Sequence, residues 1–296
     1  MHSESTQENV ASRSGLLPKP TALRVATQRA AHQVLDNPLV FDDPLAMKIL
    51  RAAEDGPLSG DLSEYNIPLL KGLRASVVVR SKLAEDEWDR SRQCGIRQYV
   101  ILGAGLDTFA YRDPCRDGSR IFEVDLPATQ QWKRNCLRIA GIEEPAYLSF
   151  VPVDFEHSTL TDALAEAGFR ADEPAFFSWL GVTMYLEEQA IMSTLRFIAS
   201  LVPGSGVVFD YTVQPSLLLP RERKAMEVLA ARAAQGGEPW KTFFDPTSLT
   251  KILHSLGFND VEDYGPEQLN GRYFSGRTDG LRKSGVSRVV YAGVIE

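Results

Sequence analysis

The chain has 296 residues, of which 44% are hydrophobic, and its formal net charge is −7. A chain of this length and composition can bury a sizeable core in one large domain or in one domain with a cap. The negative charge argues against a nucleic-acid substrate, which would require a basic surface. No apolar run approaches the roughly 18 residues that indicate a membrane span, and the N-terminus lacks the apolar stretch of a secretory signal.

Cysteine and histidine are both scarce in this sequence. The three cysteines show no C-x-x-C spacing, which predicts a reduced protein of the cytoplasm. The four histidines are scattered, without the spacing of metal ligands, so we predict no metal site.

The N-terminal third of the chain precedes any predicted strand. Residues 1–20 are polar and close with Pro18 and Pro20, which predicts a disordered leader. Residues 21–95 are helical in pattern, and their last and longest predicted helix covers residues 67–92. Because these helices come before the first strand, we expect them to pack over the ligand-binding edge of a sheet as a cap.

A short strand and a glycine turn follow. Residues 100–102 are an apolar run, which is typical of a strand buried on both faces of a parallel sheet. Gly103, Ala104 and Gly105 come directly after it, and two glycines one residue apart let the backbone turn tightly and approach a ligand. We therefore place all three residues of this turn in a cofactor site.

A second strand-like run, residues 121–124, ends in Asp125 and Leu126. Nucleoside-binding α/β folds use this order of strand, glycine turn, crossover and strand to place a carboxylate against ribose hydroxyls. Asp125 is the predicted ribose ligand, and Leu126 beside it is a predicted cofactor contact.

The turn departs from the dinucleotide fingerprint G-x-G-x-x-G. Thr108 replaces the third glycine, and Asp107 puts a negative charge where a pyrophosphate would sit. S-adenosylmethionine has a positive sulfonium and no phosphate, so this turn, with Asp107 among its cofactor contacts, suits it better than a dinucleotide.

Strands and helices alternate through the rest of residues 96–296, the predicted core domain. This alternation predicts a doubly wound, Rossmann-like α/β sheet. The last two predicted strands, residues 258–264 and 287–295, form a closing hairpin that makes the last strand antiparallel. We expect residues 265–285 between them to be a long surface loop, and residues 214–245 after the fifth strand to be a lid.

Four segments carry a family resemblance: VILGAGLDTFAYR at residue 100, FEVDLP at 122, VDFE at 153 and SWLGVTMYL at 178. They resemble the leucine carboxyl methyltransferase family, and most closely its bacterial branch, which includes polyketide O-methyltransferases. The resemblance runs from about residue 21 to the C-terminus. It implies a class I methyltransferase sheet and S-adenosylmethionine as cofactor, and says little about the substrate.

The resemblance also implies roles for individual residues. Arg80 matches a basic residue of the cap that reaches the methionine carboxylate of the cofactor, and Arg29 matches less well. Asp154 and Phe155 match an acidic–apolar pair that faces the adenine. Leu180 stands at a cofactor-contact position where many relatives have Glu, which puts an acidic group there in doubt.

The predicted acceptor site contains no histidine to act as a base. This favours an acceptor that is already ionised, a carboxylate or an acidic phenol of a small molecule. Tyr185 is predicted either to line the site of methyl transfer or to pack under the next helix, and Tyr211 either to contact substrate or to be half-buried.

Two rival functions stay open: a nicotinamide-dependent oxidoreductase, and a catalytically silent protein that only binds the cofactor. The oligomeric state is not predicted.

Overall fold

The computed structural model describes residues 20–53, 62–112, 117–155 and 159–295. The predicted disordered leader, apart from residue 20, lies outside the described residues. No helix in these ranges is both long enough and apolar enough to cross a membrane.

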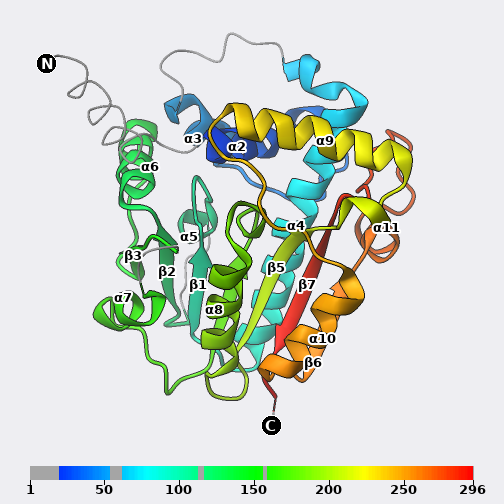
Figure 1. The fold of residues 1–296 in the computed structure, drawn as a ribbon. Coiled ribbons are helices and arrows are strands. Elements are labelled where there is room, and N and C mark those ends of the chain that lie inside the picture. Colours follow the sequence, from blue (N-terminus) through cyan, green and yellow to red (C-terminus); the bar gives the residue numbers. More distant parts are fainter. Residues whose placement is uncertain (1–19, 54–61, 113–116, 156–158, 296) are drawn as a thin grey trace, which may run out of the picture.

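The core is one seven-stranded sheet (Figure 1), in the order β3-β2-β1-β4-β5-β7-β6. The first five strands are parallel, and β7 runs antiparallel to both of its neighbours, β5 and β6. The predicted doubly wound α/β sheet with its antiparallel last strand is thus confirmed. The strands are β1 (Gln98–Leu102), β2 (Arg120–Asp125), β3 (Leu148–Pro152), β4 (Ala175–Trp179), β5 (Gly206–Thr212), β6 (Asp260–Tyr264) and β7 (Ser287–Gly293).

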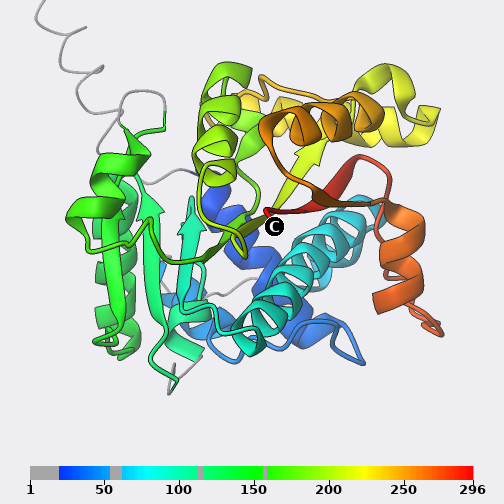
Figure 2. The ribbon, with the colours of Figure 1, turned by 90° about the horizontal axis from the view of Figure 1, so that it is seen from below.

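Helices cover both faces of the sheet (Figure 2), with α8 and α10 on one side and α4 on the other. The longer helices are α2 (Pro20–Leu35), α3 (Ala46–Ala53), α4 (Pro68–Gln93), α6 (Pro127–Ala140), α8 (Glu188–Ala199), α9 (Pro220–Gln235), α10 (Pro246–Leu256) and α11 (Pro266–Tyr273). The shorter ones are η1 (Leu62–Asn66), α5 (Phe109–Arg112), α7 (Leu160–Glu166), η2 (Thr183–Tyr185) and η3 (Pro215–Leu217).

Several helix ends follow from local sequence. Gly141 ends α6 and Gly257 ends α10, both in the left-handed conformation that glycine adopts without steric cost. The Asp245 side chain caps α10 by accepting a hydrogen bond from the Ser248 backbone N–H at 2.8 Å. These local signals place the loops that frame the sheet.

The helical section before β1 is more than a cap. Val78, Val79 and Leu83 of α4 share one buried cluster with Tyr99 of β1 and Phe176 of β4. α4 is therefore one of the helices that cover the sheet, and the boundary drawn at residue 95 divides residues of a common core. Helix α2 packs outside it, against both α3 and α4.

The region between the last two strands was expected to be a surface loop, and this expectation is wrong. It contains α11, whose Leu269 is fully buried, and after it Phe274 and Leu281 are buried against the sheet. The high glycine and charge content of residues 265–285 favoured a loop prediction. The three apolar side chains become buried only through contacts with distant parts of the folded chain.

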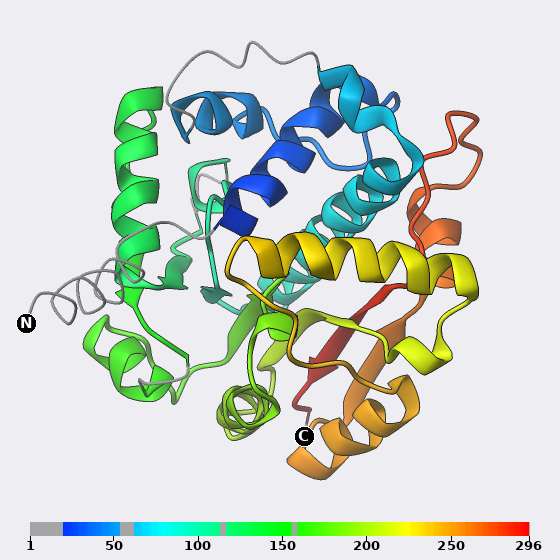
Figure 3. The same ribbon diagram turned by 45° about the horizontal axis from the view of Figure 1, so that its top comes forward.

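The segment after β5 forms α9, whose C-terminal end lies beside the N-terminal end of α2 at the edge of the sheet where the parallel strands end (Figure 3). The Glu238 carboxylate, just after α9, accepts a hydrogen bond at 2.9 Å from the backbone N–H of Thr21 in α2. The predicted lid thus contacts the predicted cap, and whether it moves stays a prediction.

Candidate functional site

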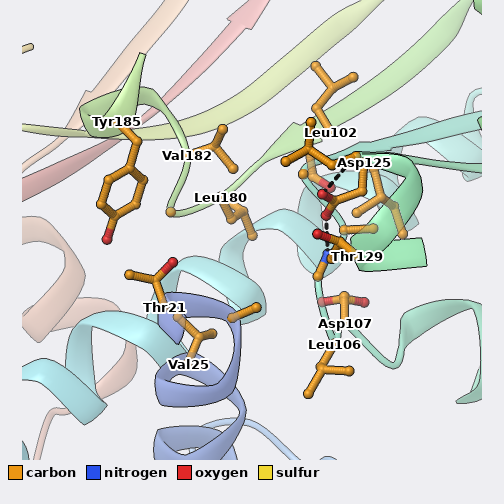
Figure 4. Close-up of a pocket in the computed structure, with 18 of the residues that line it drawn as sticks. Thr21, Val25, Leu102, Leu106, Asp107, Asp125, Thr129, Leu180, Val182 and Tyr185 are labelled. Atoms are coloured by element: carbon orange, nitrogen blue, oxygen red, sulfur yellow. Dashed lines mark hydrogen bonds between the residues drawn. The ribbon is translucent and has the colours of Figure 1, made fainter. Parts of the chain in front are cut away.

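A cavity of about 330 Å³ lies at the carboxyl ends of the parallel strands. This volume is within the range of small-molecule sites, ~300–1,000 Å³, and the carboxyl edge is where open α/β sheets bind ligands. The walls come from the loops after β1, β2, β3 and β4, from α2 and α4, and from the segment after α9. In Figure 4, Asp125 and Asp107 lie on one side of Leu180, and Tyr185 and Thr21 lie on the other.

The glycine turn after β1 forms part of this wall. Gly103 has φ +68° and Gly105 has φ +47°, a region that residues with a side chain rarely adopt. A Cβ on Gly103 would lie 2.3 Å from Val182 Cγ2 and one on Gly105 would lie 3.4 Å from Ala22 Cβ. Only glycine fits at Gly103, because Val182 occupies the adjacent space. Gly103, Ala104 and Gly105 all line the cavity.

Asp125 is positioned by the backbone around it. Its Oδ2 accepts from the Gly105 N–H at 2.6 Å, and its Oδ1 accepts from its neighbour Leu126 N–H at 2.7 Å (Figure 4). Burial raises the pKa of Asp125, and the two backbone donors offset only part of this effect. The carboxylate therefore joins the two turns and remains on the cavity wall beside Leu126.

Asp107 is on the cavity wall, but its charge is compensated. Its Oδ2 accepts from Arg29 Nη1 at 2.6 Å, and its Oδ1 accepts from the Phe109 N–H at 2.7 Å. The expected repulsion of a pyrophosphate by this charge is therefore weaker than the sequence indicates. The structure disfavours pyrophosphate binding for another reason. Helix α5, which follows the turn, has only four residues, and the backbone N–H of Phe109 at its start already donates to Asp107 instead of being available to a phosphate.

This pair makes the attachment of α2 sensitive to acid. Burial alone would raise the pKa of Asp107, but the charge of Arg29, followed by those of Lys133 and Arg112, outweighs it and lowers the pKa to about 2. The ionised Asp107 carboxylate therefore contributes to the free energy of unfolding. This contribution is present above the ordinary pKa of 3.8 and is lost as the pH falls towards 2.

We expect Asp107→Asn to lower the free energy of unfolding by about 2 kcal/mol at pH 6, with the difference shrinking below pH 4. Urea unfolding at pH 6, 4 and 3 measures it, with Asp172→Asn, an exposed carboxylate paired with Arg170, as the control. A difference between wild type and Asp107→Asn that stays constant over this range contradicts the assignment.

The predicted adenine contacts are also on the cavity wall. Asp154 and Phe155 follow β3 and line the cavity, as does Leu180 after β4. The Phe155 ring lies 5.9 Å from the Trp179 ring, so it is held against the end of β4. The structure thus gathers these residues with Asp125 and the glycine turn, and their roles in binding stay predictions.

The two basic residues of the cap have different surroundings. Arg80 lines the cavity, is 8% exposed, and forms an ion pair with Asp210 in which Nη1 lies 2.8 Å from Oδ2. Lys82, two residues after Arg80, pairs with Asp86 and does not line the cavity. Arg29 also lines the cavity, held by the carboxylates of Asp43 and Asp107.

The two candidate tyrosines are separated. Tyr185 lines the cavity, and burial raises the pKa of its hydroxyl, so it remains protonated at neutral pH. Tyr211 does not line the cavity: it is fully buried, packs on Phe244 and donates a hydrogen bond to Asp263 at 2.8 Å. The prediction that Tyr211 contacts substrate is therefore wrong. The Tyr211 side chain points to one face of the sheet, with Phe244, while that of its neighbour Asp210 points to the other face, with Arg80.

Sequence reasoning missed several wall residues. Glu238 and Lys241 come from the segment after α9, Thr21 from the first turn of α2, and Glu85 and Ser81 from α4. Glu238 is 8% exposed, unusually low for a glutamate, yet nothing in its sequence neighbourhood marks it. Ser81 and Glu85 are four residues apart and share one face of α4, next to the face of Arg80, but this spacing does not by itself indicate a site.

Comparison with known proteins identifies the family of this chain. The sequence model of the family described as leucine carboxyl methyltransferase matches residues 22–199, more than half of the chain. The chain belongs to the leucine carboxyl methyltransferase family. A protein of Bacillus subtilis (strain 168) named "Putative S-adenosyl-L-methionine-dependent methyltransferase YktD" is 35% identical over 283 residues, which cover 88% of this chain and 93% of that protein.

A second relative, from Mycobacterium bovis (strain BCG / Pasteur 1173P2), has the same name without the final designation. It is 32% identical over 253 residues, which cover 82% of this chain and 70% of the relative. All four segments of the predicted resemblance, at residues 100, 122, 153 and 178, lie inside the range that the family model matches. The family assignment made from the motifs is thus confirmed.

Solved structures support the fold. A crystal structure from Thermobifida fusca, described as that of a "putative methyltransferase", has a TM-score of 0.56 at 18% identity. The match covers 89% of this chain and 100% of that protein's chain. A DUF574 family protein from Streptomyces avermitilis has a TM-score of 0.57 at 13% identity and covers 92% of this chain and 97% of its own. At these identities the likeness shows a shared fold alone.

Proposed function

We propose that this family member transfers a methyl group from S-adenosylmethionine to an oxygen of a small acidic molecule, in the first instance a carboxylate. The observation that carries the proposal is the shared cavity. It is lined by Asp125, the glycine turn, the Asp154–Phe155 pair and Tyr185, and Figure 4 shows Asp125 and Tyr185 on opposite sides of Leu180. Family membership and the names of the relatives support the methyltransferase activity and the cofactor.

The residues present fit this cofactor. The Gly103–Gly105 turn lines the cavity with backbone, and Asp125 offers a carboxylate held by two backbone donors. In the proposed arrangement, Asp125 accepts from the ribose hydroxyls, Asp154 from the adenine amine, and Phe155 packs on the adenine ring. Arg80 holds the methionine carboxylate. Bound there, S-adenosylmethionine supplies an electrophilic methyl group on a sulfonium.

The acceptor side of the cavity contributes positioning. The lining residues that the structure describes include no histidine, and Tyr185 remains protonated, so Tyr185 donates a hydrogen bond instead of taking a proton. A carboxylate acceptor is ionised at neutral pH and needs no base. Holding such an acceptor in line with the methyl group can supply about 7–11 kcal/mol of the acceleration.

Methyl-labelled S-adenosylmethionine tests the proposal with a panel of aromatic and aliphatic carboxylic acids and the matching phenols. We expect label to enter the acids, and mild alkali to release it as methanol, because a methyl ester hydrolyses where an aryl methyl ether does not. Label that resists alkali would move the acceptor to a phenol oxygen.

The labelling experiment, together with binding titrations, separates the rival functions. A protein that binds S-adenosylmethionine but labels no acceptor, with the panel extended to extracts of a bacterial host, would be a silent binding protein, the reading that Leu180 favours. A protein that binds NADH in a fluorescence titration and does not bind S-adenosylmethionine would be an oxidoreductase. Either result overturns the proposed function.

A further inference from the structure

A buried carboxylate behind the cavity holds two parts of its wall together. Asp210, in β5, is 2% exposed. Its Oδ2 accepts from Arg80 Nη1 at 2.8 Å, and its Oδ1 accepts from the Gly181 backbone N–H at 2.5 Å. Its backbone oxygen accepts from Thr183 Oγ1 at 2.6 Å. Asp210 thus joins α4 to the turn after β4, while no atom of Asp210 lines the cavity.

The turn that Asp210 holds is packed closely against both Arg80 and the glycine turn. Gly181 has φ +74°, and a Cβ on it would lie 2.4 Å from Arg80 Nη2. The guanidinium therefore lies directly against the Gly181 backbone. The next residue, Val182, fills the space beside Gly103. Asp210 consequently fixes the position of Arg80 relative to the turn on which the cofactor is proposed to lie.

The chemistry of this contact requires a carboxylate. Two oxygens accept from two donors in different segments, and an amide in the same place would turn one acceptor into a donor facing an N–H. An arginine held in this way loses little conformational freedom when it binds a carboxylate, because its planar fork is already oriented. The same ion pair also removes part of the charge that Arg80 could offer to a ligand, so the two effects oppose each other.

We propose that Asp210 is a positioning residue: it holds the Arg80 guanidinium against the Gly181 turn so that Arg80 meets the amino-acid carboxylate of the cofactor in one orientation. This inference rests on the proposed function. It goes beyond the expected contact between Arg80 and the cofactor, because it assigns the geometry of that contact to a residue that touches neither cofactor nor acceptor.

Two ligands separate this role from a general structural one. S-adenosylhomocysteine has the amino-acid carboxylate, and 5′-methylthioadenosine has the same nucleoside without it. We expect Asp210→Asn to raise the dissociation constant of S-adenosylhomocysteine about tenfold in a calorimetric titration, and that of 5′-methylthioadenosine less than about twofold. Arg80→Gln should show the same selectivity, and Asp210→Asn in the Arg80→Gln background should add nothing.

Asp263→Asn is the matched control. Asp263 is a largely buried carboxylate that holds an arginine, Arg288, at 2.9 Å and accepts from Tyr211, but this trio does not line the cavity. We expect it to change neither dissociation constant. If Asp210→Asn does not fold, Arg80→Lys replaces it, because lysine keeps the charge and lacks the fork that Asp210 and Gly181 orient.

Three results overturn the inference: equal weakening of both ligands, unchanged affinity for S-adenosylhomocysteine, or tighter binding of it. Tighter binding would mean that Asp210 serves mainly to neutralise Arg80. For Arg80→Lys, equal or absent weakening has the same consequence. If the wild-type protein binds neither ligand, the proposed function fails instead, so the two failures are distinguishable.

Discussion

Gly103→Ala is expected to destabilise the protein by about 3 kcal/mol and to abolish measurable cofactor binding. The left-handed conformation costs a side chain roughly 1–2 kcal/mol, and overpacking adds about 1–3 kcal/mol. The overpacking arises because the new Cβ would lie 2.3 Å from Val182 Cγ2. Urea unfolding measures the stability, and a calorimetric titration with S-adenosylmethionine measures the binding.

Gly141→Ala separates the two costs of this change. Gly141 has a similar φ of +64°, but a Cβ there would meet nothing within 4 Å, and it lies outside the cavity wall. Its alanine variant should lose only the conformational part of the stability and bind the cofactor normally. Val182→Ala, combined with Gly103→Ala, should recover the overpacking part. Equal destabilisation by the two single glycine variants would show that Val182 yields and that the clash is unimportant.

Asp125→Asn is expected to raise the dissociation constant of S-adenosylmethionine at least tenfold, which corresponds to about 1.4 kcal/mol. The ribose would lose a charged acceptor, and either the Gly105 or the Leu126 N–H would face an amide donor. Because burial raises the pKa of Asp125, wild-type binding should also weaken on acidification at a pH above the usual range for an aspartate. Calorimetric titration across pH measures both effects.

Asp117→Asn is the control for this change. Asp117 accepts a backbone hydrogen bond from Ser119 at 3.1 Å in the turn before β2, at the opposite end of that strand from Asp125. We expect its variant to bind the cofactor as the wild type does and to keep the same pH dependence. Unchanged affinity in Asp125→Asn would remove Asp125 from the proposed site.

Much of the fold could be predicted because its signals are local. Apolar runs predict the buried strands, and Gly141 and Gly257 end α6 and α10 in the left-handed conformation that glycine favours. Helix α11 escaped prediction because its stabilising contacts are distant in sequence: Leu269 packs in a cluster with residues of α4 and β1. A segment rich in glycine and charge shows no such contact in its own pattern.

The sequence by itself determined the glycine turn, the acidic residue at the end of the second strand and the family, because each depends on residue type at fixed short spacing. The tertiary structure alone decided which of two adjacent residues in β5, Asp210 or Tyr211, contacts a residue of the cavity wall. Every residue of β5 is buried, so hydrophobicity does not distinguish its faces. Alternation along the strand sends Asp210 towards Arg80 and Tyr211 towards Phe244. Likewise the partner of Asp107 is Arg29, 78 residues away, and only chain folding brings those charges together.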